Sequence, residues 1–166
     1  MDFDLKLLSR DAISEALEKA ERYRLLNEPW QAESICLDIL RIEPTNQTAL
    51  INLLLSITDQ FGPEIPALRA REVLRSIQGE YERAYYAGII SERCARARMK
   101  QSIPGANQRA YQEFTDAMHW YETAEAQRPQ GNDDPILRWN TCARTLMRHP
   151  ELYPQVEERM QTVLED

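Results

Sequence analysis

The side chains that most often perform acid–base or nucleophilic catalysis are few in this sequence and lie far apart. Its two histidines, His119 and His149, are isolated, and their spacing fits no Ser-His-Asp or Cys-His arrangement. His119 lies in the run Met-His-Trp-Tyr, which is typical of an amphipathic residue at the edge of a core. No glycine-rich phosphate loop is present, and the acidic turn at residues 131–134 lacks the later glutamate of a calcium loop. The chain is therefore expected to be no enzyme and to need no cofactor.

The spacing of the cysteines bears on metal and disulfide chemistry. Cys36, Cys94 and Cys142 form no close pair and are odd in number. A disulfide framework or a zinc site would need even or clustered spacing. Reduced, mostly buried thiols and no metal site are therefore expected.

Charge is unevenly distributed along the chain. The 20 basic and 27 acidic residues give a formal net charge of −7, which disfavours general nucleic-acid binding. Residues 83–110, however, carry six basic side chains and one acid. On a helix, Arg93, Arg96 and Lys100 would lie within a sector of about 60° and form a basic ridge. Such a ridge attracts an acidic peptide, a phosphate or RNA. It is equally open to neutralisation by the acids of the next predicted helix, Glu113, Asp116 and Glu122.

The elements that must position these side chains are predicted to be helices. Apolar residues recur at three- and four-residue spacing, few stretches alternate apolar with polar residues, and only 5 glycines occur. Proline-containing turns divide the chain, with Thr45 and Asp134 as expected N-caps. The predicted helices cover residues 9–26, 30–42, 47–60, a stretch from the turn at Pro66 to about Ile77, 80–100, 106–127, 134–148 and 155–164. We expect one all-α domain, residues 1–166, of about eight helices in four antiparallel pairs, with an elongated third pair.

Nothing in the sequence predicts a membrane or secretory protein. The longest strongly apolar stretch, residues 49–57, is far too short to cross a bilayer. The first residues, Met-Asp-Phe-Asp-Leu, lack the basic and apolar regions of a signal peptide. A cytoplasmic protein that makes no membrane contact is therefore expected.

Small and aromatic residues repeat at fixed spacing in the predicted helix pairs. The first copy comprises Ala20, Tyr23, Ala32, Cys36, Ile39 and Pro44. A second copy of its later half comprises Ala117, Tyr121, Ala124 and Pro129. A weaker middle copy contains Ala70, Leu74 and Ile77, and residues 134–140 look like the opening of another. This pattern resembles that of the tetratricopeptide repeat (TPR) family. The resemblance implies a right-handed solenoid with repeats at about 12–46, 47–79, 80–131 and 134–166.

The resemblance also implies a function, because TPR domains bind a peptide or helix of another protein in a concave groove lined by the first helix of each pair. The register places the following residues in this groove: Leu17, Glu21, Arg24, Ile51, Asn52, Leu55, Trp139, Asn140 and Met147. A clamp for a C-terminal carboxylate is disfavoured, because Leu17 and Glu21 stand where it would need lysine and asparagine. The aliphatic residues could instead pack between helices, and Trp139 could cover the end of the core.

The function expected from these observations is that of a protein–protein interaction adaptor or assembly scaffold. Three alternatives stay open at this stage. One is a small acidic chaperone of the secretion type, which would hold an unfolded client. Another is the binding of an acidic ligand by the basic ridge, and the third is a module that associates with itself.

Overall fold

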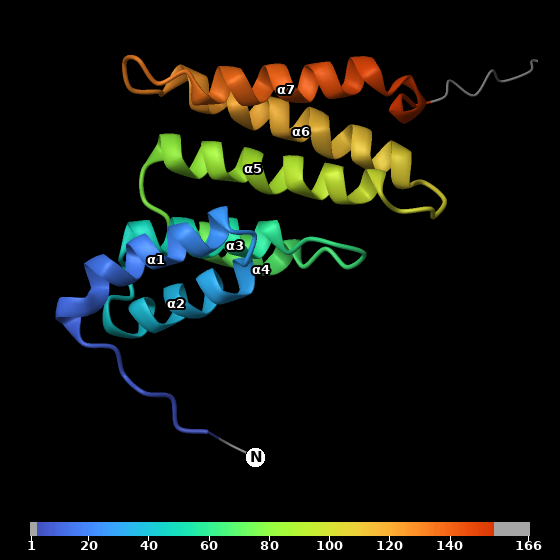
Figure 1. The fold of residues 1–166 in the computed structure, drawn as a ribbon. Coiled ribbons are helices and arrows are strands. Elements are labelled where there is room, and N and C mark those ends of the chain that lie inside the picture. The colour runs from blue at the N-terminus through green and yellow to red at the C-terminus, as the bar shows by residue number, and fades with distance from the viewer. Residues whose placement is uncertain (1–2, 155–166) are drawn as a thin grey trace, which may run out of the picture.

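The computed structural model describes residues 3–154 of the chain, and within this part all the regular secondary structure is helical (Figure 1). Its helices are α1 (Ile13–Leu25), α2 (Pro29–Ile42), α3 (Gln47–Asp59), α4 (Ala67–Leu74), α5 (Glu80–Met99), α6 (Ala106–Ala126) and α7 (Asp134–Arg148). Short 3-10 turns, Arg10–Ala12 and Pro150–Leu152, precede α1 and follow α7. The prediction of an all-α fold is confirmed. The helix predicted over residues 155–164 lies outside the described residues.

The helix boundaries differ from the prediction at the caps. The side chain that caps α3 is Asn46, whose Oδ1 accepts a hydrogen bond from the Ala49 N–H at 2.9 Å, and not Thr45. Asp134 is the first residue of α7 and not its N-cap, and its N–H donates to Oδ1 of Asn132 at 3.1 Å. Helix α4 ends at Leu74, so that the buried Ile77 follows it in a turn.

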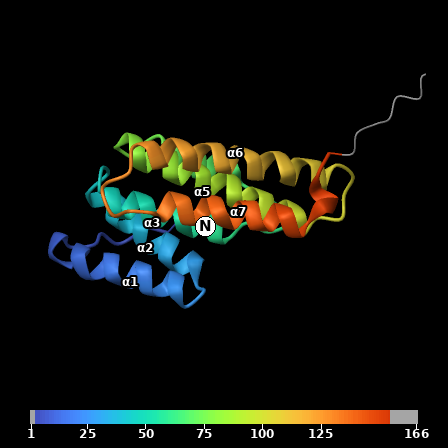
Figure 2. The same ribbon diagram turned by 90° about the horizontal axis from the view of Figure 1, so that it is seen from above.

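Helices that follow one another in the sequence are also neighbours in space. Every helix from α1 to α6 packs against the next, while α1 also contacts α3, and α3 also contacts α5. Figure 1 shows α5, α6 and α7 stacked above the group formed by α1 to α4. The view from above shows α6 and α7 running alongside α5 (Figure 2). The third predicted pair, α5 and α6, is long, at 20 and 21 residues.

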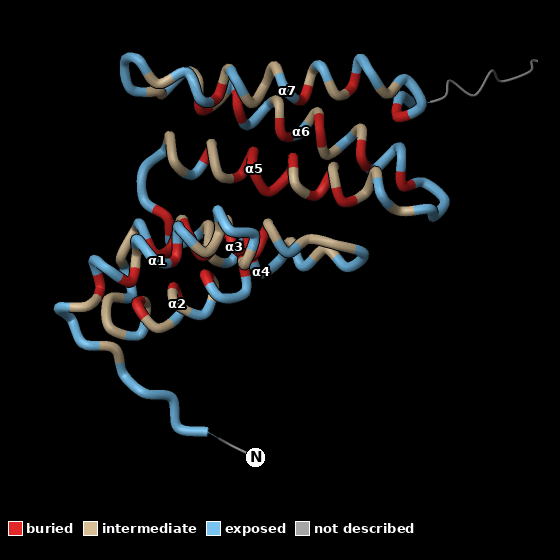
Figure 3. The backbone as a smooth tube through the Cα atoms, viewed as in Figure 1, coloured by how far each residue is buried: buried red, intermediate tan, exposed pale blue. Residues whose placement is uncertain are grey.

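Helix α5 contributes to two hydrophobic cores (Figure 3). Ile90 and Cys94 belong to the core formed with α1 to α4, whereas Ile89 and Ala95 belong to the core formed with α6 and α7. A helix that is covered on opposite sides must carry apolar or small residues over most of its surface. This requirement explains why α5 has ten buried residues, of which four are alanines and one is glycine.

Small residues lie where the helices approach one another most closely. Ala20, Ala32, Ala117 and Ala124, which the sequence pattern singled out, are all 0% exposed. Side chains of this size allow two helix backbones to come together without a gap. The same holds for Gly88 of α5, over which the ring of Tyr121 lies.

The three cysteines are predicted to resist modification in the folded protein. Cys36, Cys94 and Cys142 are free thiols with 0 to 2% of their surface exposed. Burial raises the pKa of Cys36 and Cys142 to about 12 and that of Cys94 to about 11. Since the thiolate is the reactive form, a disulfide reagent such as Ellman's should not react with the native protein at mildly alkaline pH. It should titrate all three thiols after unfolding in guanidinium chloride, and fast reaction of the native protein would contradict the expected burial.

Candidate protein-binding surface

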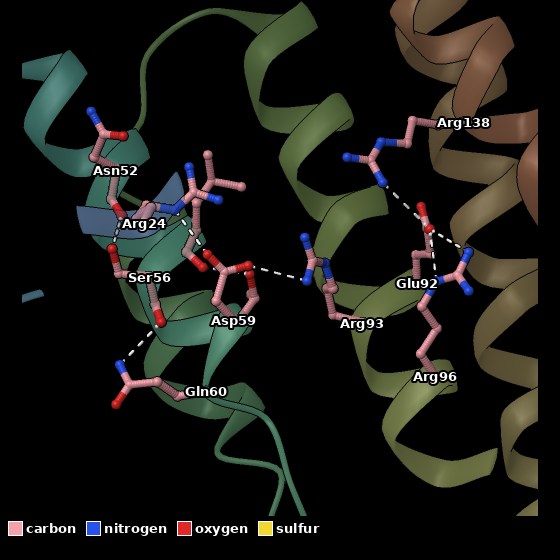
Figure 4. Close-up of polar contacts among 11 residues, drawn as sticks. Arg24, Asn52, Ser56, Asp59, Gln60, Glu92, Arg93, Arg96 and Arg138 are labelled. Carbon is pink, nitrogen blue, oxygen red and sulfur yellow. Dashed lines mark hydrogen bonds and ion pairs between the residues drawn. The ribbon is translucent and has the colours of Figure 1, made fainter. Parts of the chain in front are cut away.

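Charged side chains from α1, α3 and α5 meet at Asp59, the last residue of α3 (Figure 4). The Nε–H of Arg24 donates to Oδ2 of Asp59 at 2.9 Å, and Nη1 of Arg93 lies 3.1 Å from Oδ1. The Asp59 carboxylate, with 17% of its side chain exposed, is therefore shared by two guanidinium groups. A carboxylate at a helix C-terminus is unfavourable beside the negative end of the helix dipole. The two arginines offset this cost and tie α1, α3 and α5 together.

A second charged cluster is centred on Glu92, the residue before Arg93 in α5. Its side chain is 1% exposed. Arg96 donates to Oε1 from Nε at 3.1 Å and from Nη2 at 3.0 Å, and the Tyr121 hydroxyl donates to Oε2 at 2.7 Å. Nη1 of Arg138 in α7 lies 3.5 Å from Oε1. Glu92 is thereby bonded from α5, α6 and α7 at once.

The two clusters lie side by side in Figure 4 and together carry an excess of positive charge. Four arginines surround two carboxylates, which leaves a formal charge of +2 in a protein whose net charge is −7. A guanidinium group has five N–H donors, and Arg24 uses only its Nε–H within the described residues. The remaining N–H groups of Arg24 can therefore donate hydrogen bonds to a carboxylate or to backbone carbonyls of a ligand.

Asn52 of α3 precedes Asp59 by seven residues, so that the two lie on the same face of the helix at about 100° per residue, and Figure 4 draws Asn52 near Arg24. The residue is 9% exposed, and its backbone carbonyl oxygen accepts a hydrogen bond from the Ser56 hydroxyl at 2.7 Å. Its side-chain amide has no hydrogen-bond partner among residues 3–154, yet neither amide atom is sealed from solvent. An amide in this situation can bond the backbone of a bound segment.

The aliphatic residues predicted in the groove are in packing positions. Leu17 is half-buried against the small core of Ile13, Ala16, Ile39 and Ala49. Ile51 packs against the core of α1 to α4, and Leu55 packs against both cores. Of the polar residues predicted in the groove, Arg24 and Asn52 lie near Asp59, whereas Glu21 is exposed and takes no part in the charged clusters.

The predicted groove residues of α7 are not grouped with the charged clusters. Trp139 is half-buried against the core of α5 to α7, and its Nε1–H donates to Oε1 of Glu122 at 3.0 Å. Asn140 is half-buried, and Met147 is 69% exposed. Sequence analysis did not identify the neighbouring Arg138, which reaches the Glu92 cluster.

The residues of the predicted basic ridge are in three different surroundings. Arg93 contacts Asp59, Arg96 bonds to Glu92, and the exposed Lys100 borders a separate hollow next to Phe61 and Ile103. The neighbouring Arg98 lies 3.3 Å from Glu113, whose pKa burial raises. The sequence suggested acids of α6 as the neutralising partners, but those of Arg93 and Arg96 are on α3 and on α5 itself. Asp59 and Glu92 were missed, although Glu92 is the single acid of the basic stretch.

Residues 3–154 carry neither a metal-binding cluster nor a membrane-spanning helix. Within this part of the chain, no group of three or more histidine, cysteine, aspartate or glutamate residues is placed to hold a metal ion. None of the described helices combines the length and the apolar character that crossing a membrane requires.

Comparison of the chain with protein-family models, with curated proteins and with solved structures found no match in any of the three. The fold and the charged surface are therefore the basis for assigning a function.

Proposed function

We propose that this chain is a TPR-like scaffold of the cytoplasm, a right-handed solenoid that binds a segment of a partner protein without catalysing a reaction. The packing of each helix against the next in the sequence supports this proposal, as do the contacts between the alternate helices α1, α3 and α5. The complete burial of Ala20, Ala32 and Ala117, at positions that the TPR pattern reserves for small residues, supports it further. In the proposed arrangement α1, α3 and α5 are the first helices of their pairs and contribute the binding face, and Arg138 of α7 reaches its edge through Glu92.

The observation that carries the proposal is the arrangement of Arg24 and Arg93 about Asp59, with Asn52 nearby. Sequence analysis placed Arg24 in a groove and Arg93 on a competing ridge, but the two side chains share one carboxylate. Guanidinium groups bind carboxylates strongly, and a side-chain amide can form hydrogen bonds with the free backbone groups of an extended segment. The favoured ligand is therefore a peptide segment that carries at least one acidic side chain.

The test uses a partner captured from the source cells, identified by mass spectrometry and then titrated by calorimetry. Arg93→Gln should weaken binding by about 1 to 3 kcal/mol, because it removes a donor at the centre of the proposed face. Asp59→Asn should strengthen binding, because it frees both arginines for the ligand, although it should lower the stability of the fold. Arg148→Gln is the matched control, since Arg148 is exposed on α7 and has no carboxylate partner among the described residues. Should Arg93→Gln and Asp59→Asn both leave the affinity unchanged, the face is not the binding surface.

A further inference from the structure

A groove lies between α4 and α6, with α5 as its floor. Its two lobes have volumes of about 440 and 410 Å³, and both are lined by Leu74, Arg75, Ala87 and Trp120. The groove exists because α4 has 8 residues, whereas α5 and α6 have 20 and 21. Helix α4 is too short to cover α5 along its whole length. The small side chains of Ala84 and Ala87 leave the uncovered part of α5 recessed.

The α4 edge of this groove is basic. Arg71 of α4 and Arg75, the C-cap of this helix, are one helical turn apart, and Arg83 of α5 also lines the groove. Among the described residues, no carboxylate comes within 4.0 Å of any of these three guanidinium groups. The groove contains two acids, Glu80 and Asp116, and the second already accepts a hydrogen bond from Gln112. Three arginines against two acids leave a positive groove on a protein with a net charge of −7.

The α6 edge of the groove is aromatic. Trp120 contributes to both lobes and has 41% of its surface exposed. Trp120 faces the arginine-bearing edge across a floor that includes Ala87 and Ile90. Tryptophan and arginine are both enriched among the residues that dominate the binding energy of protein interfaces. The groove thus combines a basic edge, an apolar floor and an aromatic edge.

We propose that this groove is a second docking site, whose occupant is an acidic amphipathic segment of a partner protein. The apolar side chains of the segment would contact Trp120 and Ala87, and its carboxylates would pair with Arg71 and Arg75. This site is distinct from the face around Asp59, because the floor residues Ala84, Ala87 and Ser91 point about 180°, 120° and 160° away from Arg93 on α5 at about 100° per residue. The inference goes beyond the proposed function: a chain with both sites joins two partners on opposite sides of α5.

The test measures the binding of a fluorescein-labelled synthetic peptide, with leucine and glutamate at helical spacing, by fluorescence anisotropy. The same peptide with glutamine in place of glutamate is the ligand control. Arg71→Gln combined with Arg75→Gln should weaken binding of the acidic peptide about tenfold or more and reduce its dependence on salt. Trp120→Ala should also weaken it about tenfold.

Arg144→Gln combined with Arg148→Gln is the matched control variant. These two arginines are also one turn apart, exposed and without a described carboxylate partner, but they lie on α7. The control pair should change the affinity less than twofold, and Arg24→Gln should leave it unchanged, which separates this site from the proposed function. The proposal fails if the wild type does not bind the acidic peptide, if the control pair weakens binding as much as the α4 pair, or if Trp120→Ala has no effect. A concentration-dependent dimer that Trp120→Ala abolishes would also overturn it, because the occupant would then be a second copy of the chain.

Discussion

Gly88→Ala is expected to lower the free energy of unfolding by about 2 to 3 kcal/mol, although alanine is the better helix former. A Cβ atom at this position would lie 2.5 Å from Cε1 and 2.8 Å from Cδ1 of Tyr121. The ring cannot move aside easily, because it is 0% exposed and its hydroxyl is bonded to Glu92, one turn along from Gly88. The gain in helix propensity is about 1 kcal/mol, so the steric cost decides the sign. Urea unfolding followed by far-ultraviolet circular dichroism measures the difference.

The control is the same substitution in a Tyr121→Leu background. Leucine has no ring over Gly88, so Gly88→Ala should there be neutral or stabilising by up to about 1 kcal/mol, as helix propensity alone predicts. An equal loss of stability in both backgrounds would show that the tight approach of α5 and α6 at Tyr121 is not the cause.

Helix positions and buried alanines were predictable from the sequence because their signals are local. Periodic apolar residues and prolines fix each helix to within a few residues, as in α2, which was expected over 30–42 and begins at Pro29. The burial of Ala32 and of Ala117 could be predicted because each alanine belongs to a spacing pattern within its own helix pair. Capping was predicted less well, since Thr45 and Asn46 are both competent cap residues and only the backbone geometry decides between them.

The polar contacts of the candidate surface were not predictable because they join distant parts of the chain. Arg24 and Asp59 are separated by 35 residues, and Arg138 and Glu92 by 46. The predicted helices offered each arginine several acidic residues as possible partners, and the sequence does not show which of them it contacts. The groove beside Trp120 was missed for a related reason: it depends on where α4 ends, and the periodic pattern had extended this helix to about Ile77.

The last prediction concerns the buried cluster around Glu92, where Glu92→Leu should destabilise the fold by about 3 kcal/mol. The largest part of this loss comes from the Tyr121 hydroxyl, which is fully buried and would have no acceptor. Arg96 and Arg138 contribute less, because 40% and 36% of their side chains are exposed and water can solvate them. Since domains of this size are stable by about 5 to 15 kcal/mol, the loss should shift the urea midpoint clearly.

Tyr121→Phe distinguishes this account from a simple loss of packing, because its effect should change sign with the residue at position 92. In the wild type it removes one donor from a buried carboxylate and should cost about 1 to 2 kcal/mol. In the Glu92→Leu background it removes an orphaned hydroxyl instead and should restore about 1 to 2 kcal/mol, since two apolar partners bury no unsatisfied group. If Tyr121→Phe destabilises both backgrounds equally, the two residues are not coupled. Glu92 would then stabilise the fold only through its ion pairs with Arg96 and Arg138. The tyrosine would contribute only through the packing of its ring between α5 and α6.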